Sequence, residues 1–190
     1  MTTLLLHGGE SAPTTPVSRA GGLPLVPAGF VWPLCVECEG AMQFIAHLDR
    51  GKDVVSVFMC QNDPGLCQEW EPSAGGNRAF VFPAEGLSPA ALPAEGETLL
   101  GRTVVLAARP FGSVRYGEEE AWGPVDGRSV LGQLGGEPYW LQNEETPDCA
   151  GCAQPMGFVA QLDEVANFGG GYAYVFTCDP CREAAFLWQC

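Results

Sequence analysis

The sequence predicts a mainly β protein, with an α+β fold as the alternative, made of two similar β lobes that each carry a site of four cysteines. Three observations support this prediction. A constant shift of 114 positions aligns two parts of the chain, each part holds four of the nine cysteines, and apolar residues alternate with period two after the first cysteine pair of each part. The 25 glycines and 16 prolines indicate many turns, and no long amphipathic helix is found.

The alignment between the two parts contains no gap. The residues that coincide are Gly21, Gly22, Pro24, Pro33, Cys35, Cys38, Met42, Phe44 and Asp49 with Gly135, Gly136, Pro138, Pro147, Cys149, Cys152, Met156, Phe158 and Asp163. Two segments related in this way should share a fold. We therefore expect a single compact unit over residues 1–190, divided into repeat 1 at 18–83, a connecting β segment at 84–128 and repeat 2 at 129–190.

Ahead of the first repeat, Thr3–Leu6 is predicted to be a short buried strand that ends in the turn His7-Gly8-Gly9. In each repeat a strand should follow the first cysteine pair, with alternating apolar residues on its inward face. These residues are Met42, Phe44, Ala46 and Leu48 in the first repeat and Met156, Phe158, Ala160 and Leu162 in the second. A turn and a second apolar run, Val54–Met59 or Tyr172–Thr177, would complete a hairpin whose far end carries the remaining cysteines.

Four short segments lie between the two hairpins. Ala79–Phe82 and Thr103–Leu106 are predicted strands because they are rich in β-branched and aromatic residues. Ser88–Leu92 is predicted to form one helical turn, and the acidic run Glu118–Glu120 a solvated loop.

The two cysteine sets are the predicted metal ligands: Cys35, Cys38, Cys60 and Cys67, then Cys149, Cys152, Cys178 and Cys181. Their spacings are Cys-x₂-Cys-x₂₁-Cys-x₆-Cys and Cys-x₂-Cys-x₂₅-Cys-x₂-Cys. Thiolates two residues apart reach adjacent corners of a tetrahedron from one tight turn, and a distant pair completes it, so we predict two zinc ions. Because four sulfur ligands leave no position for water, such sites are structural.

Other interpretations of the cysteines stay open on sequence alone. The cysteines could form disulfides in a secreted protein, act as a thioredoxin-like redox pair or hold iron–sulfur clusters, which use the same ligands. The repeats could also exchange ligands, with Cys35 and Cys38 joining Cys178 and Cys181. Cys190 lies outside both sets and is given no role.

The formal charge of −14 excludes some classes of partner. An acidic surface repels phosphate backbones and anionic lipid, so nucleic acid and membranes are not expected partners, whereas a basic protein is. No apolar run is long enough to span a bilayer, and the N-terminus lacks the basic start of a secretion signal. We expect a cytoplasmic protein, and the sequence does not predict its oligomeric state.

No catalytic motif stands out. Gly-x-Ser-x-Gly, a phosphate-binding loop and His-Glu-x-x-His are all missing from the sequence. His47 and Gln161, which are equivalent under the shift, are expected to hydrogen-bond at turns or strand ends rather than to meet in a shared cleft. The chain is therefore expected not to be an enzyme.

Part of this pattern is found in known families. The stretch from Gly21-Gly22-Leu23-Pro24 through Trp32-Pro33 to Met42–Asp49 resembles the YwqG-like bacterial family of unknown function. The second copy, Gly135–Trp140 with the cysteine pair and Met156–Asp163, is similar to zinc-bearing relatives of programmed cell death protein 2. YwqG-like proteins often lack the cysteines, and the eukaryotic relatives carry a further zinc finger that is not found here.

The resemblance implies a duplicated, mostly β fold without established enzymatic activity. It also implies a role like that of the eukaryotic relatives, which are chaperones for a basic ribosomal protein of the small subunit. The expected function is thus a non-enzymatic zinc-binding interaction module that escorts a basic protein. The alternatives are an immunity protein that neutralises a toxin by binding it, and an enzyme that uses a cleft between the lobes.

Overall fold

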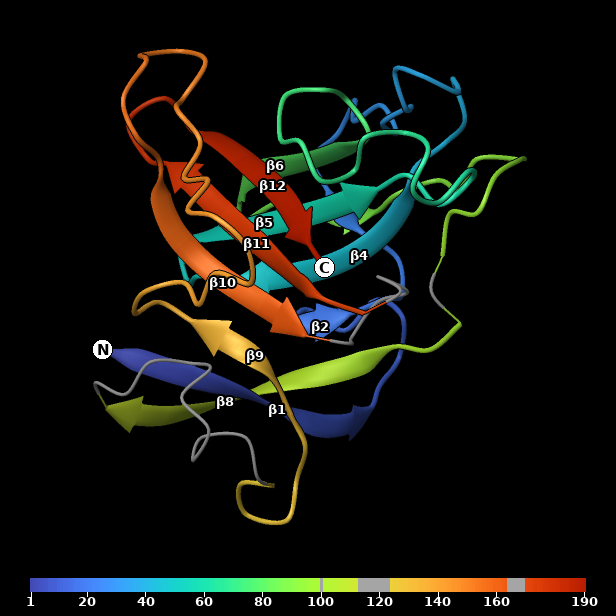
Figure 1. Ribbon diagram of the computed structural model, residues 1–190. Helices are drawn as coiled ribbons and strands as arrows, with labels where there is room; N and C mark the ends of the chain where they lie inside the picture. The colour runs from blue at the N-terminus through green and yellow to red at the C-terminus, as the bar shows by residue number, and fades with distance from the viewer. Residues whose placement is uncertain (100, 113–123, 164–169) are drawn as a thin grey trace.

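A computed structural model describes residues 1–99, 101–112, 124–163 and 170–190, and within these ranges it contains strands, turns and loops but no helix (Figure 1). Ten strands close a barrel in the order β1-β8-β2-β4-β5-β6-β12-β11-β10-β9, and β3 and β7 form a separate ladder. The prediction of a mainly β, duplicated fold is confirmed. The strands are β1 (Thr2–Glu10), β2 (Arg19–Ala20), β3 (Leu25–Val26), β4 (Gln43–Asp49), β5 (Asp53–Met59), β6 (Asn77–Pro83), β7 (Ser88–Pro89), β8 (Val104–Gly112), β9 (Val130–Leu134), β10 (Gly157–Asp163), β11 (Tyr172–Cys178) and β12 (Glu183–Gln189).

The two repeats contribute matching sets of four strands, β2-β4-β5-β6 and β9-β10-β11-β12. Their pairing registers are equivalent under the shift of 114 positions. The pairs that coincide are Arg19 with His47 and Ala20 with Ala46 in the first repeat, and Gln133 with Gln161 and Leu134 with Ala160 in the second. The sequence duplication is thus also a duplication of strand order and register.

Strands β1 and β8 each pair with the repeat that they do not precede in the chain. β8, which precedes repeat 2 in the chain, pairs with β2 of repeat 1, whereas β1, which precedes repeat 1, pairs with β9 of repeat 2. β1 and β8 also pair with each other, with Leu6 opposite Ala107. The first half, β8-β2-β4-β5-β6, therefore matches the second half, β1-β9-β10-β11-β12, strand by strand. The halves meet at β1·β8 and at β6·β12, which closes one barrel rather than two separate lobes.

A β-bulge divides the residues that were predicted to share one face of β4. The pairing register with β5 shifts between Phe44 and Ala46, and the register of β10 with β11 shifts between Phe158 and Ala160. Because a bulge adds one residue to one strand, the side chains after it change face. Ala46 and Leu48 lie in the barrel core, whereas Met42 and Phe44 belong to an aromatic cluster outside it. The equivalent residues of β10 are divided in the same way.

The core inside the barrel comes from both halves. It contains small, branched and aromatic side chains from nearly every long strand, including Leu5, Val57, Leu106, Val175 and Phe186. Two apolar clusters outside the barrel wall, one in each half, each include cysteines of one set. A third cluster forms around Leu4 and Leu6 of β1.

Two predicted segments differ in the structure. The chain does not turn at His7-Gly8-Gly9, because β1 continues to Glu10 and these glycines mark a register shift against β8. Ser88–Leu92 is not helical, because β7 pairs with β3 and the amide of Ala90 donates to the carbonyl of Pro24. The strand predicted at 79–82 is confirmed within β6, and the one predicted at 103–106 is confirmed from Val104, where β8 begins. The loop predicted at 118–120 lies outside the described residues.

The Gly-Gly-x-Pro motif turns the chain over the outer face of each half. All four glycines, Gly21, Gly22, Gly135 and Gly136, have φ between 62° and 79°, where a side chain would be strained. In the first half the guanidinium of Arg19 donates to the carbonyls of Gly21 and Leu23. In the second half the Gln133 amide donates to the carbonyl of Glu137 at 2.8 Å. The motif therefore directs the β2–β4 and β9–β10 connections back across the barrel, above the outer apolar clusters.

Candidate metal centres

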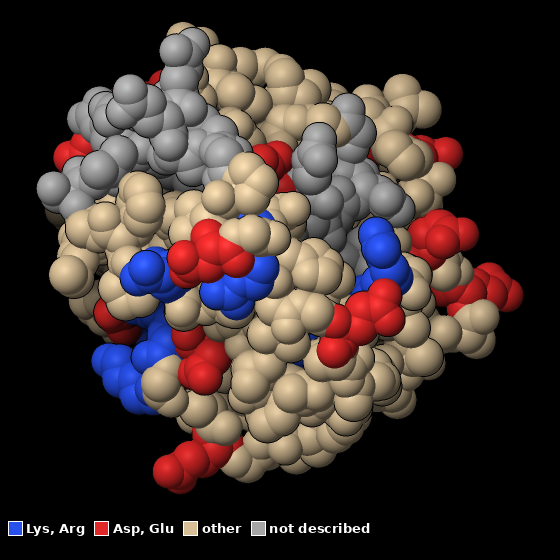
Figure 2. All heavy atoms as spheres, turned by 90° about the horizontal axis from the view of Figure 1, so that it is seen from below, with Lys and Arg blue, Asp and Glu red and all other residues tan. Residues whose placement is uncertain are grey.

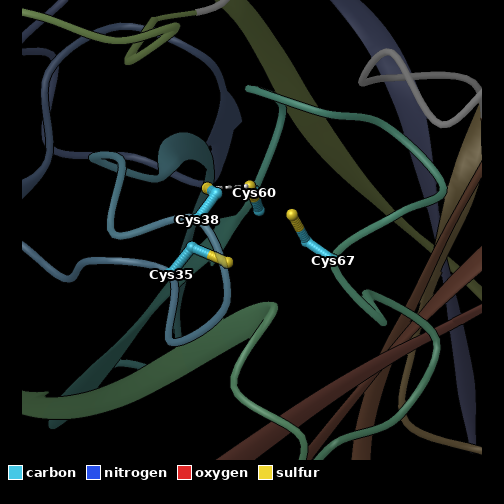
Figure 3. A group of neighbouring side chains, drawn as sticks. All are labelled: Cys35, Cys38, Cys60 and Cys67. Carbon is cyan, nitrogen blue, oxygen red and sulfur yellow. Dashed lines mark hydrogen bonds between the residues drawn. The ribbon is translucent and has the colours of Figure 1, made fainter.

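The structure brings together each of the two predicted cysteine sets. Within each set the four Sγ atoms lie within 4.8 Å of one another. Figure 3 shows the first set, Cys35, Cys38, Cys60 and Cys67, with the sulfur atoms turned toward a common centre. The Sγ atoms of Cys38 and Cys60 are 3.6 Å apart, and those of Cys152 and Cys178 are 3.7 Å apart. Each group comes from one repeat, so the alternative in which the repeats exchange ligands is wrong.

The two first pairs share the same tight turn. The Cys35 amide donates to the carbonyl of Gly40 at 2.9 Å, and the Cys149 amide donates to the carbonyl of Gln154 at 2.8 Å. Inside this loop the amide of the residue after the second cysteine donates back to the carbonyl of the first, at 3.0 Å in repeat 1 and 2.8 Å in repeat 2. These bonds fold each turn so that both of its sulfur atoms face the second pair.

All four turns end in a residue with positive φ. Each of these residues directly follows the last cysteine of its turn. Their φ angles are 59° at Glu39, 52° at Gln68, 53° at Ala153 and 56° at Arg182. Only one other non-glycine residue in the described ranges has positive φ. The left-handed conformation reverses the chain directly after the cysteine. The wide loop before Cys67 therefore ends in the same local geometry as the three tight pairs.

The first group is buried among aromatic side chains. Cys35, Cys60 and Cys67 are buried, and Trp32 and Phe30 pack in the same cluster. The side-chain amide of Asn62 lies 3.7 Å from the Sγ of Cys38 and 3.5 Å from the Sγ of Cys60. Such N–H donors stabilise thiolate ligands in metal sites. Sequence analysis missed Asn62. Its position between Cys60 and Cys67 is the sequence feature that could have indicated a contact with the sulfur atoms.

The second group is more accessible. Cys152 is exposed, and a carboxylate oxygen of Glu183 lies 3.2 Å from the Sγ of Cys149 and accepts the Gly151 amide at 3.3 Å. A backbone hydrogen bond from Gln154 lowers the pKa of Cys152. Sequence analysis missed Glu183, which no motif distinguishes.

Ion pairs join the second group to the first half. Arg50, in the β4–β5 turn, contacts Asp179 at 3.1 Å, and its hydrogen bonds lower the pKa of that carboxyl group. Arg182 contacts Asp53 at 3.3 Å. The Cys178-to-Cys181 turn of repeat 2 is thus fixed against the hairpin turn of repeat 1.

His47 and Gln161 lie at equivalent, buried positions in different halves. The Gln161 side-chain oxygen accepts the amide of Tyr139 at 2.8 Å, which agrees with the expected hydrogen-bonding role. His47 lies opposite Arg19 in the sheet, and its Nδ1 atom has no hydrogen-bond partner. Burial, with a smaller effect of the Arg19 charge, lowers the pKa of His47 to about 4.

The fold and the cysteine geometry together define the class: an all-β, internally duplicated barrel with one four-cysteine group in each half, each of which could hold a metal ion. In the described residues no helix is long and apolar enough to cross a membrane.

Comparison with known proteins finds one partial relative. No family model matches the chain. A segment of 65 residues, 32% of this chain, is 38% identical to the uncharacterized protein YpfL of Salmonella typhimurium. The matched segment spans 15% of that relative's length.

Proposed function

We propose that the protein is a non-enzymatic zinc-binding interaction module that binds and escorts a basic protein, and that it is related to the YwqG-like proteins and to programmed cell death protein 2. The observation that carries this proposal is the geometry of both cysteine groups, in which the four sulfur atoms of a group lie within 4.8 Å of one another. A metal held by four thiolates has no open position for water or substrate, so its role is to hold turns together.

The sulfur geometry supports zinc as the metal. In a tetrahedral shell with zinc–sulfur bonds of about 2.3 Å, neighbouring sulfur atoms are about 3.8 Å apart. The Cys38–Cys60 and Cys152–Cys178 sulfur separations, 3.6 Å and 3.7 Å, are close to this value. Zinc bound in this way would cross-link the far end of each hairpin to the loop before it, and would stabilise the surface that those turns carry.

Exposed apolar side chains near the cysteines of the first group support protein binding. Its side chains come from the β3–β4 connection and from the loop around the last cysteine. They are Val31, Leu34, Val36, Leu66 and Trp70, all exposed. The loop and the connection are joined by a hydrogen bond from the Val36 amide to the carbonyl of Gly75, at 3.2 Å. Apolar side chains grouped on a surface mark protein-interaction sites more often than scattered ones do.

The charge supports a basic partner. The chain has 23 acidic and 9 basic residues. Figure 2 shows the molecule from below the view of Figure 1, and on this face Lys and Arg side chains lie beside Asp and Glu. We therefore expect a basic protein to bind another face of the molecule.

Affinity capture followed by native mass spectrometry tests the proposal. The tagged protein is purified from its own host at low salt, and bound proteins are identified before and after a wash at high salt. We expect a stoichiometric basic protein that salt releases, because acidic and basic surfaces attract through screened charges. A ribosomal partner would support escort, and a toxin would support the immunity role. Only substoichiometric, salt-resistant proteins in the eluate would contradict both.

A further inference from the structure

A cavity of about 430 Å³ opens on the outer face of the second half. Its apolar wall is made by Trp140, Met156, Phe158 and Phe176, which belong to the outer apolar cluster beside the second cysteine group. Its polar wall comes from the β9–β10 connection. The polar residues are Glu137, Glu144 and Thr146.

In the first half, aromatic side chains lie at the positions equivalent to two polar residues of the cavity. Under the shift of 114 positions, Glu144 corresponds to Phe30 and Thr146 to Trp32. In the first half these two aromatic side chains fill the space above Phe58, with ring centroids at 6.0 Å and 5.5 Å. Phe30 also contacts the rings of Phe80 and Phe82 at 5.7 Å and 5.8 Å. One half therefore has a filled aromatic cluster where the other has a cavity with acidic and hydroxyl side chains.

The floor of the cavity has the same composition in both halves. Met156, Phe158 and Phe176 correspond to Met42, Phe44 and Phe58 through the aligned strands. The rings of Phe158 and Phe176 are 5.7 Å apart, close to the 5.3 Å between Phe44 and Phe58. The second half therefore keeps the aromatic floor and replaces the two side chains that would cover it.

Trp140 adds a ring that the first half lacks. It corresponds to Val26, and its indole stacks on Tyr174 at 4.7 Å and on Phe176 at 6.0 Å. Tyr174 fixes this arrangement, because its hydroxyl donates to the carbonyl of Tyr139 at 2.7 Å and accepts the amide of Leu141 at 3.1 Å. The indole is thus held against the cavity by its neighbours on both sides in sequence.

The charged residues that line the cavity, Glu137 and Glu144, are both acidic. Residues 129–181 contain seven acids and no Lys or Arg. Glu144 is exposed and accepts the Thr146 hydroxyl at 3.4 Å. An acidic rim over aromatic rings favours an organic cation, because ring faces attract cations and a carboxylate can pair with the charge.

We propose that this cavity binds the side chain of an arginine presented by a protein partner. The inference rests on the proposed function, in which the partner is basic, and it assigns the residue that the partner inserts. A guanidinium is planar, stacks on aromatic rings and pairs with carboxylates through two N–H groups, so it suits these walls better than a compact ammonium does. Glu144 is the ion-pair partner, and Trp140 and Phe158 contact the guanidinium and its aliphatic stem.

The first test titrates the full-length protein, as purified, with N-acetyl-arginine N-methylamide and follows the indole N–H signals by NMR, with Trp140 assigned from a Trp140→Phe variant. We expect saturable shifts at Trp140. The citrulline analogue, which has the same shape without the charge, should give none. Glu144→Gln should weaken binding about threefold to tenfold, and the matched control Glu85→Gln, an exposed acid of the first half, should not. Equal binding of citrulline, or equal effects of the two variants, would overturn the proposal.

A second variant distinguishes loss of the cavity from loss of the folded structure. Glu144→Phe with Thr146→Trp transfers the two covering side chains of the first half, so it should fill the cavity and keep or raise the melting temperature. It should also abolish the arginine shifts, and retention of these shifts in the folded variant would overturn the inference.

The partner experiment separates this inference from the proposed function. Capture of the basic partner by the filled variant at the wild-type level would overturn the arginine site alone. Absence of any stoichiometric basic partner from the wild-type eluate would instead overturn the proposed function, on which the physiological role of the arginine site depends.

Discussion

The residues that end the four cysteine turns are held in a conformation that L-amino acids seldom adopt. Ala153 has φ of 53°, and the equivalent Glu39 has φ of 59°. At such positions glycine has no steric cost, whereas a β-branched side chain is strongly disfavoured. The turns therefore keep some backbone strain, which metal binding at the adjacent sulfur atoms would offset.

We expect Ala153→Val to destabilise the protein by on the order of 1–2 kcal/mol and Ala153→Gly to be neutral or stabilising by up to about 1 kcal/mol. Urea unfolding of the metal-bound protein measures both. Ala150→Val, in the same exposed turn without positive φ, is the matched control and should change stability by no more than about 0.5 kcal/mol. Equal effects of valine at 150 and 153 would show that the backbone conformation is not the cause.

His47 makes stability depend on pH. Its pKa is about 4 in the folded protein, against 6.5 for an ordinary histidine, because it is buried and faces Arg19. The unfolded state therefore binds more protons below pH 6.5. The stability that the neutral imidazole contributes is complete above that pH and is lost as the pH falls toward 4.

The His47→Gln variant, which installs the residue found at the equivalent position 161, should remove this dependence. Wild type should lose about 2 kcal/mol more than the variant between pH 7 and pH 5. Chemical denaturation at several pH values measures the two slopes, and both proteins keep the same cysteine groups. Parallel slopes would mean that folding does not lower the pKa of His47.

At the scale of elements, the cysteine groups connect hairpin ends to the loops before them. In the second group, Cys149 and Cys152 lie before β10, Cys178 ends β11, and Cys181 lies before β12. Loss of one ligand should therefore release the β9–β10 connection, which also carries the wall of the cavity.

Cys152→Ser should bind one metal ion in place of two and should lower the melting temperature by several degrees or more, since structural zinc contributes on the order of 10 kcal/mol in small modules. Cys190→Ser changes an exposed thiol outside both groups and should alter neither quantity. Elemental analysis with calorimetry gives both values. Two metal ions in the Cys152 variant would exclude this residue as a ligand.

The elements also show which features a sequence pattern can and cannot predict. The hairpins, their strands and the members of both cysteine groups followed from spacing and alternation. The bulge after Phe44 did not, because alternation alone cannot distinguish one continuous face from a face that changes after an extra residue. The duplication held the available clue: Phe44-x-Ala46 recurs as Phe158-x-Ala160, and the bulge recurs with it.

At the scale of the whole molecule, the exchange of β1 and β8 joins the two halves. Each half is completed by a strand that precedes the other repeat, so neither repeat carries a full set of five strands in one continuous segment. The duplication suggested two lobes, but the pairing partners of β1 and β8 lie far away in sequence, and short-range patterns do not encode them.

This arrangement predicts cooperative unfolding. Leu5 is fully buried in the barrel core on β1, and Leu5→Ala should cost about 2–4 kcal/mol. Because β1 contacts both halves, hydrogen exchange should accelerate equally in β4–β5 and in β10–β11. Leu92→Ala, at an exposed site, should change neither. Faster exchange confined to one half would contradict the single barrel.

We expect each half of the duplicated barrel to hold a zinc ion on its four thiolates. Native mass spectrometry of the full chain, purified without chelators and compared with the denatured mass, tests this most directly. The expected result is a mass increase equal to two zinc ions less the protons that the thiolates release. A metal-free mass, or one lower by the hydrogens of cysteine pairs oxidised to disulfides, would contradict it.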